Sequence, residues 1–294
     1  MKKLVECVPN FSEGRRLEVV EKIVAAIAAV REVKILDYSA DADHNRSVVT
    51  FVAPPETVGQ AAFAAIETAA ELIDMTAHTG QHPRIGATDV CPFIPLSGAT
   101  LAECIAIARE VGRQVGERLA IPVYLYEHAA TRPERRNLAD VRRGQYEEIS
   151  RTIGRDPQRA PDFGPARLGS AGATAIGARD FLIAFNVYLT TDQVDIAKQI
   201  AAAVRHSSGG LRYVKALGLL VDGQAQVSMN LTDFQQTPIF RVVELIRREA
   251  ARYGVNIASS ELIGLIPQQA LLDAAAWYLQ LADFDSSRVL ENRL

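Results

Sequence analysis

The sequence of 294 residues has little cysteine, no long apolar run and no strong excess of either charge. Cys7, Cys91 and Cys104 are too few and too scattered for a disulfide framework or a zinc site, and they indicate a reducing compartment. A net charge of −3 gives no basic field that would favour nucleic acid. No apolar run approaches the roughly 18 residues of a membrane span, and MKKLVECVPN lacks the apolar segment of a signal peptide. We therefore expect a cytoplasmic protein with no membrane or nucleic-acid partner.

The apolar spacing in the first half predicts alternating strands and helices. Strands are expected at 3–8, 33–38, 46–53, 90–96 and 121–126, and helices at 17–30, 57–75 and 101–118. Ser12 is the expected N-cap of the first helix. The order is β-α-β-β-α-β, followed by an additional helix and strand.

The second half repeats this order without recognisable sequence identity to the first. Strands are expected at 181–189, 211–221, 225–234 and 255–266, and helices at 191–205, at 238–254 and from Pro267 through Trp277. We therefore predict an α/β (α+β) fold of two ferredoxin-like split β-α-β subdomains, residues 1–177 and 178–294. The Gly/Pro/Ala-rich join, 161–177, is either a flexible linker or an ordered loop lying against a ligand.

The segment HTGQHPRIGATDVCPFIPL, residues 78–96, is the most informative part of the chain. Gly80, Pro83 and Gly86 prevent a regular helix, so the segment is predicted to present a polar loop before a strand. His82 is the candidate proton carrier, because histidine titrates nearest neutrality, and Arg84 is its candidate anion-binding neighbour. The alternative is a structural histidine that holds the loop.

The spacing of His78 and His82 also permits a metal hypothesis, but a zinc HxxxH motif needs helix geometry and a third ligand. His78 can instead orient His82 or lie on the surface. Cys91 is more consistent with packing than with nucleophilic chemistry. No GxGxxG follows a strand and there is no P-loop. We therefore predict no metal, flavin or nicotinamide cofactor.

Three other polar positions are candidate ligand contacts. Asn10, at the end of the first strand, either makes turn contacts or binds a polar ligand. Arg46 can hold a substrate carboxylate bidentately if the loop that precedes it faces His82. Asn186 lies in an apolar run and must find partners, either across the strands or in a ligand. The basic run 132–144 is either a solvated helix and loop or a means of attracting an anion.

Taken together, several long blocks resemble glutamate formiminotransferase. They are VECVPNFSEG, NRSVVTFV, HPRIGATDVCPFIPL, PVYLY, PDFGP, GARDFLIAFNVYL, QVSMNLTDF and ELIGLIPQQALLDAAAWYL. The blocks occur in the same order over nearly the whole chain, which makes chance a poor explanation. The resemblance implies two α/β subdomains with a folate groove between them.

The resemblance also implies transfer of the formimino group from N-formimino-L-glutamate to tetrahydrofolate, the co-substrate, in histidine breakdown. The histidine of the HPR motif, His82 here, is implied as the general acid–base. The folate-contacting stretch that follows DFGP corresponds here to Gly164, Pro165, Ala166, Arg167, Leu168, Gly169, Ser170, Ala171 and Gly172. This stretch reads GPARLGSAG, where some family members have aromatic residues.

The same resemblance implies a homodimer, and it implies a separate cyclodeaminase as pathway partner, because we expect no cyclodeaminase domain in this chain. Three alternatives stay open on the residues alone. The donor can be formiminoglycine or formylglutamate, the chain can be a non-catalytic folate-binding protein, or His78 and His82 can serve a metal hydrolase.

Overall fold

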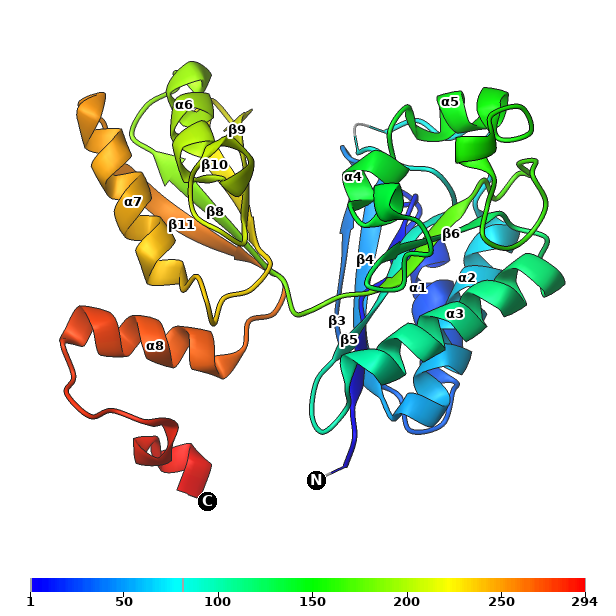
Figure 1. The fold of residues 1–294 in the computed structure, drawn as a ribbon, viewed down its shortest axis with the longest axis horizontal. Helices are drawn as coiled ribbons and strands as arrows, with labels where there is room; N and C mark the ends of the chain where they lie inside the picture. Colours follow the sequence, from blue (N-terminus) through cyan, green and yellow to red (C-terminus); the bar gives the residue numbers. More distant parts are fainter. Residues whose placement is uncertain (1, 81, 294) are drawn as a thin grey trace. The chain divides into compact units, whose positions relative to one another are not determined.

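The structure is a computed structural model that describes residues 2–80 and 82–293. Gln81, within the predicted 78–96 segment, lies outside the described residues, as do the terminal Met1 and Leu294 of the predicted subdomains. The chain divides into two compact units, one ending at Asp180 and the other starting at Phe181 (Figure 1).

The first unit contains seven strands and five α-helices within its described residues. The strands are β1 (Val5–Cys7), β2 (Asn10–Phe11), β3 (Lys34–Asp41), β4 (Arg46–Ala53), β5 (Thr88–Pro95), β6 (Val123–Glu127) and β7 (Thr174–Ala178). The helices are α1 (Leu17–Ala28), α2 (Pro55–Leu72), α3 (Leu101–Arg118), α4 (Leu138–Val141) and α5 (Gln145–Thr152). Single 3-10 turns lie at Pro133–Arg135 and Pro157–Arg159.

The strands form one mixed sheet in the order β3, β4, β1 with β2, β5, β7, β6. β1 and β2 are successive parts of one strand position, interrupted at Val8 and Pro9, and both pair antiparallel with β4 and β5. Pro9 cannot donate to the ladder, but its carbonyl accepts a hydrogen bond from Val49 N at 3.1 Å. The predicted β-α-β-β-α-β order with an additional helix and strand is confirmed.

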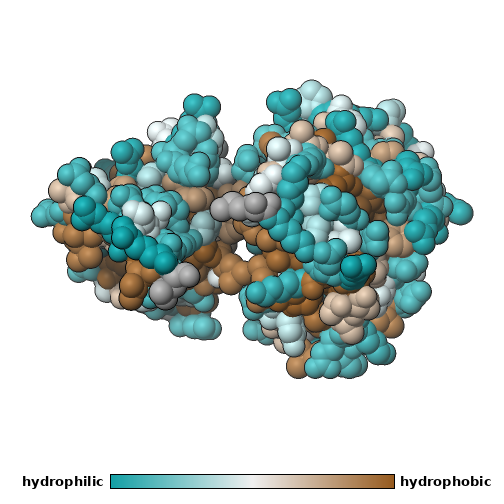
Figure 2. All heavy atoms as spheres, turned by 90° about the horizontal axis from the view of Figure 1, so that it is seen from below, coloured by the Kyte–Doolittle hydropathy of each residue, from teal (hydrophilic) through white to brown (hydrophobic). Residues whose placement is uncertain are grey.

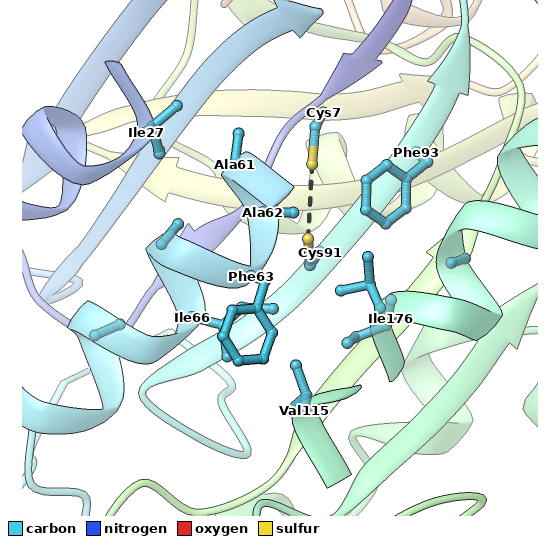
Figure 3. Close-up of a cluster of buried hydrophobic side chains, with 14 of the residues drawn as sticks. Cys7, Ile27, Ala61, Ala62, Phe63, Ile66, Cys91, Phe93, Val115 and Ile176 are labelled. Atoms are coloured by element: carbon cyan, nitrogen blue, oxygen red, sulfur yellow. Dashed lines mark hydrogen bonds between the residues drawn. The ribbon is translucent and has the colours of Figure 1, made fainter. Parts of the chain in front are cut away.

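Opposite faces of this sheet pack against different helices, because side chains alternate along each strand. Cys91 and Phe93 belong to the large apolar core that includes residues of α1, α2 and α3, and Figure 3 shows Cys7 and Cys91 within it. Val90 instead joins a smaller cluster with Tyr124, Tyr126 and residues of α4 and α5. Cys91 is buried and free, so its predicted packing role is confirmed.

The join 161–177 is not a flexible linker, because its last residues form β7. This strand lies between β5 and β6, parallel to both, and every one of its residues is buried. Its sequence, TAIGA, shows no alternation, as is usual for a parallel strand covered on both faces. The preceding residues form an ordered loop hydrogen-bonded to the first unit, described with the site below.

The predicted cap of the first helix is wrong. α1 begins at Leu17, and the Glu13 carboxylate accepts hydrogen bonds from the backbone N–H groups of Arg15 and Arg16 at 2.9 and 3.0 Å. The Ser12 hydroxyl is turned elsewhere and donates to the Gly86 carbonyl at 2.8 Å. Ser12 therefore connects the first strand to the His82 segment rather than starting a helix.

The second unit contains four strands and three α-helices within its described residues. They are β8 (Ile183–Leu189), α6 (Val194–Val204), β9 (Val214–Val221), β10 (Gln224–Leu231), α7 (Ile239–Arg252), β11 (Ile257–Ile263) and α8 (Gln268–Leu279). Short 3-10 turns lie at His206–Ser208, Ser286–Arg288 and Leu290–Arg293. The antiparallel sheet has the order β11, β8, β10, β9, which is the ferredoxin-like arrangement predicted from the sequence.

α6 and α7 supply the helical side of the core of this second unit. Several large apolar side chains outside that core are exposed. Figure 2 shows hydrophobic residues among hydrophilic ones on the surface of the protein. They include Trp277, whose ring stacks on Phe240 at 4.6 Å between centroids. Within residues 2–80 and 82–293, no helix combines the length and apolarity needed to cross a bilayer.

Candidate active site

His82 lies, partly buried, in the loop between α2 and β5, in a strongly cationic environment. Burial, and next the electrostatic effects of Arg46, Arg142 and His44, lower the pKa of its imidazole to about 3. The ring is therefore neutral at physiological pH and is able to accept a proton.

Arg46, at the start of β4, is oriented by Asn10. Asn10 Oδ1 accepts from Arg46 Nε at 3.1 Å and also from Arg46 Nη2, while Asn10 Nδ2 donates to the Val8 carbonyl at 2.9 Å. Burial, and next the charge of Arg142, lowers the pKa of Arg46 to about 10. Arg46 was predicted to hold a carboxylate if the loop before it faces His82. That loop contacts His78 and Thr79, in the segment that carries His82. The amide of Asn10 positions Arg46 and has both its polar atoms engaged.

Arg142 is the second arginine that acts electrostatically on His82, and the sequence pattern did not indicate it. It follows α4, and its Nη2 donates to Asp89 Oδ2 in an ion pair with little exposure on either side. The other Asp89 oxygen accepts from Ile85 N at 3.0 Å. Asp89, which had no partner visible in the sequence, thus fixes both the strand start and a distant arginine.

Asn45 joins three segments that are far apart in the sequence. Its Oδ1 accepts from Gly14 N at 3.0 Å, its Nδ2 donates to the Thr79 carbonyl at 2.9 Å, and its own carbonyl contacts His78 Nε2 at 3.3 Å. Asn45 adopts a left-handed backbone conformation, φ 48°, which asparagine tolerates better than most residues. This buried residue therefore places the Arg46 loop against the His82 loop. The left-handed preference of Asn was the only available sequence signal for it.

His78 and Arg84 form a second, supporting group. Arg84 Nε donates to His78 Nδ1 at 3.2 Å, and its Nη atoms donate to Gln145 Oε1 and to both carboxylate oxygens of Glu147 at 2.6 to 3.0 Å. Both ring nitrogens of His78 are in contact with protein atoms, Asn45 O and Arg84 Nε. The Arg84 side chain is 9% exposed and its donor atoms face protein acceptors, so it connects the loop to α5.

The loop Gly164–Gly172, predicted to contact folate, lies against the backbone of the His82 segment. Ala87 N donates to the Ala171 carbonyl at 2.8 Å, and Ala173 N donates to the Ile85 carbonyl at 2.9 Å. Met75 N donates to the Ser170 carbonyl at 2.7 Å. Most residues of the loop are exposed or half-buried. Backbone hydrogen bonds thus hold the loop beside the segment that carries His82.

Asn186 belongs to the second unit, where its partners lie on a neighbouring strand. It lies on β8 opposite Glu261 of β11, and its Nδ2 donates to Glu261 Oε2 at 3.1 Å. The Tyr188 hydroxyl donates to the same oxygen at 3.1 Å. The cross-strand alternative considered from the sequence therefore describes Asn186, and its role in binding folate stays a prediction.

The interpretation of the basic run 132–144 as a solvated helix and loop is only partly correct. Arg143 is exposed, but Arg135 is buried in an ion pair with Asp162 and lies over the Tyr124 ring at 5.1 Å. Arg142 is largely buried against Asp89. The reason is that acidic partners from other elements neutralise these two arginines, which local sequence does not reveal. Among the described residues, no group of three or more His, Cys, Asp or Glu is placed to hold a metal ion.

The fold and this cluster define a two-unit α+β protein whose first unit brings together a neutral histidine, two arginines and a glycine-containing loop. The N-terminal subdomain of the formiminotransferase domain matches residues 4–179, and the formiminotransferase domain matches residues 184–291. The chain belongs to the formiminotransferase family.

The relatives support this membership over the whole length. The chain is 52% identical to glutamate formimidoyltransferase from Thermoplasma acidophilum, covering 99% of this chain and 97% of that one. It is 49% identical to the protein of the same name from Streptococcus pyogenes serotype M1, covering 100% and 99%. It is 44% identical to formimidoyltransferase-cyclodeaminase from Rattus norvegicus, covering 95% of this chain and 53% of that longer protein.

Proposed function

We infer that this chain is a glutamate formimidoyltransferase, which transfers the formimino group from N-formimino-L-glutamate to tetrahydrofolate and releases L-glutamate. The observation that carries this function is the full-length identity of about half to two proteins of that name. The grouping of His82 with Arg46 and the loop 164–172 supports the same chemistry. Tetrahydrofolate is a co-substrate in this reaction.

In the proposed mechanism His82 moves the protons. N5 of tetrahydrofolate attacks the formimino carbon and must lose a proton, and the glutamate nitrogen must gain one before it leaves. A neutral imidazole can take the first proton and return it in the second step, an effect of about 10²–10⁴-fold in rate. Holding both substrates in line supplies a further part of the acceleration.

His82 is neutral and so is free to accept the first proton, but its low pKa makes it a weak base. The positive charges of Arg46 and Arg142 contribute to this low pKa, after burial. An anionic substrate group bound at these arginines would offset their charge and raise the pKa of His82 toward the working pH. We propose that binding of substrate therefore brings the pKa of the histidine nearer the working pH, where it can both take a proton and return it.

The other substrate contacts follow from position. We propose that the loop Gly164–Gly172 and Asn186 contact folate, and that Arg46 binds a substrate carboxylate. Asn10 holds Arg46, and Arg84 holds the loop that carries His82, so both residues would serve the site by positioning it. We further propose that residues 1–177 and 178–294 are the two functional subdomains, a boundary that lies three residues before the division of the compact units at Asp180.

We also propose a cytoplasmic location, since three buried free cysteines suit a reducing compartment. A homodimer and a cyclodeaminase that consumes the product complete the proposal. The name of the rat relative joins a formimidoyltransferase to a cyclodeaminase, which supports a cyclodeaminase as the pathway partner.

The test of the function is an absorbance assay for 5-formiminotetrahydrofolate with purified protein, tetrahydrofolate and one donor at a time. Formiminoglutamate, formiminoglycine and formylglutamate are the three donors. Product from formiminoglutamate alone is expected. Product only from another donor would reassign the substrate. Tight folate binding with no transfer from any donor would replace the enzyme by a non-catalytic folate-binding protein.

A further inference from the structure

We propose that Arg142 is a substrate-binding residue, which together with Arg46 holds the α-carboxylate of the formimino donor beside His82. This inference rests on the proposed function and names the donor group that the site selects. Arg142 comes from the segment after α4, about 60 residues beyond His82, and it is the second arginine whose charge acts on that histidine.

The guanidinium of Arg142 is only partly used by the protein. Its Nη2 is bound to Asp89, but its Nε is buried and has no hydrogen-bond partner among the residues that the structure describes. A buried donor without an acceptor is destabilising, so such a group points to an acceptor that arrives with a ligand. A carboxylate is the acceptor that a guanidinium binds best.

The local charges leave one anion to be supplied. Arg46 and Arg142 contribute two positive charges, and Asp89 contributes one negative charge that is already paired with Arg142. Arg46 contacts only the neutral amide of Asn10 among the hydrogen-bond partners found in residues 2–80 and 82–293. Asp89 and, less strongly, Asp41 also act on Arg46, but Asp89 is paired with Arg142, and Asp41 is exposed with its carboxylate 2.7 Å from His44 Nδ1. A single carboxylate would therefore neutralise the buried group.

Covalent geometry assigns that carboxylate to the donor. In formiminoglutamate the α-carboxyl carbon is three bonds from the formimino carbon, about 4 Å at most with ordinary bond lengths. The glutamate of tetrahydrofolate is separated from N5 by the aminobenzoyl group, a distance on the order of 10 Å or more. A histidine that protonates the leaving nitrogen must lie beside the α-carboxylate, which is attached to the adjacent carbon. Arginines that act electrostatically on His82 are thus placed for this group.

The experiment compares Arg142→Gln with Arg143→Gln in the full chain. Arg143 is the matched control, because it is the next residue, its side chain is 73% exposed and it pairs with Asp140. Steady-state transfer is measured with formiminoglutamate, its α-amide and its γ-amide. For Arg142→Gln we expect KM for formiminoglutamate to rise about 10- to 100-fold, with KM for tetrahydrofolate unchanged. The preference of the wild-type protein for formiminoglutamate over the α-amide should fall to near unity, whereas discrimination against the γ-amide should persist.

A second pair of variants separates substrate binding from support of Asp89. If Arg142 only neutralises Asp89, the double variant Asp89→Asn, Arg142→Gln should recover the wild-type KM, and the proposal would be overturned. Equal losses with all three donors, or a wild-type KM in Arg142→Gln, would overturn it as well. Arg142→Lys, which keeps the charge, replaces Arg142→Gln if the latter does not fold. Should the wild-type protein transfer from no donor, the proposed function fails, and calorimetric binding of formiminoglutamate and its α-amide still decides the role of Arg142.

Discussion

Gly86 and Gly172 meet backbone to backbone, in an isolated antiparallel bridge between the His82 segment and the predicted folate loop. A Cβ on Gly86 would lie 1.9 Å from the Ala173 carbonyl oxygen, and one on Gly172 would lie 2.7 Å from Gly86 Cα. Gly172 also has a positive φ of 71°. The segment that carries His82 and the predicted folate loop can therefore approach each other this closely because both positions are glycine.

We predict that Gly172→Ala loosens this contact. A left-handed alanine and a backbone collision should together cost about 1–3 kcal/mol of stability and reduce folate affinity, because the loop can no longer lie against Ile85 and Gly86. Thermal unfolding and a folate fluorescence titration measure the two effects. Gly254→Ala is the control, since Gly254 lies outside the loop, has a positive φ of 69° and has nothing within 4 Å of a Cβ there. Equal folate affinity in both variants would contradict this prediction.

Asn45 provides the next prediction. Asn45→Ala removes hydrogen bonds to Gly14 and Thr79 and puts alanine at a positive φ, so we expect a stability loss of about 2–3 kcal/mol and reduced turnover. Asn45→Gly removes the same bonds but relaxes the backbone, and it should lose less stability than alanine. Denaturant unfolding of both variants separates the backbone effect from the side-chain effect, and identical losses would show that the conformation of Asn45 is unimportant.

Much of this architecture follows from sequence periodicity. The strand 46–53 and the helix 101–118 are found with the predicted bounds, since both are long and strongly patterned. β7 was not predicted, because a short strand of small residues, covered on both faces and embedded among glycines, carries no periodic signal. The same limit applies to the very short helix α4.

Only those residues of the candidate site could be predicted whose role is indicated by their own residue type and neighbouring sequence. His82 and Arg46 were found because their residue types and loops suggested them. Arg142 was not, because its burial depends on Asp89, 53 positions away, and an arginine in a basic run looks solvated when read alone. Arg84 was predicted to bind a carboxylate, and it has one in Glu147, from within the protein. The sequence therefore predicted that Arg84 binds a carboxylate, but it did not reveal that the fold supplies this carboxylate from Glu147.

For Arg84 we predict a positioning role. Arg84→Lys loses the fork that holds Glu147 and Gln145, so stability should fall by about 1–3 kcal/mol while the KM for formiminoglutamate stays within about twofold. Glu147→Gln should cost at most about 1 kcal/mol, because the Glu147 side chain is more than half exposed. Calorimetry and steady-state kinetics on both variants provide the measurements. A large rise in KM for Arg84→Lys with unchanged stability would instead assign Arg84 to the substrate.

His82→Ala should retain the fold and folate affinity but lose most turnover, about 10²–10⁴-fold, because no other residue would carry the proton at the reacting atoms. Turnover is measured by formation of 5-formiminotetrahydrofolate, and binding by titration. His128→Ala is the control, since His128 is half exposed and pairs with Asp180 away from the arginine cluster. Unchanged turnover in His82→Ala would remove the histidine from the mechanism.

The low proton affinity of His82 also predicts how stability depends on pH. Its pKa is about 3 in the folded chain, mainly through burial, and about 6.5 when unfolded. Between these values the unfolded chain binds a proton that the folded chain does not, so the free energy of unfolding falls as pH decreases through this window. The stability that comes from keeping His82 neutral is fully present above pH 6.5. His82→Gln, which cannot titrate, should therefore lose less stability than the wild-type protein between pH 6.5 and about 4. Melting temperatures over that range decide the point, since parallel curves for the two proteins would mean that burial and the nearby arginines do not hold His82 neutral.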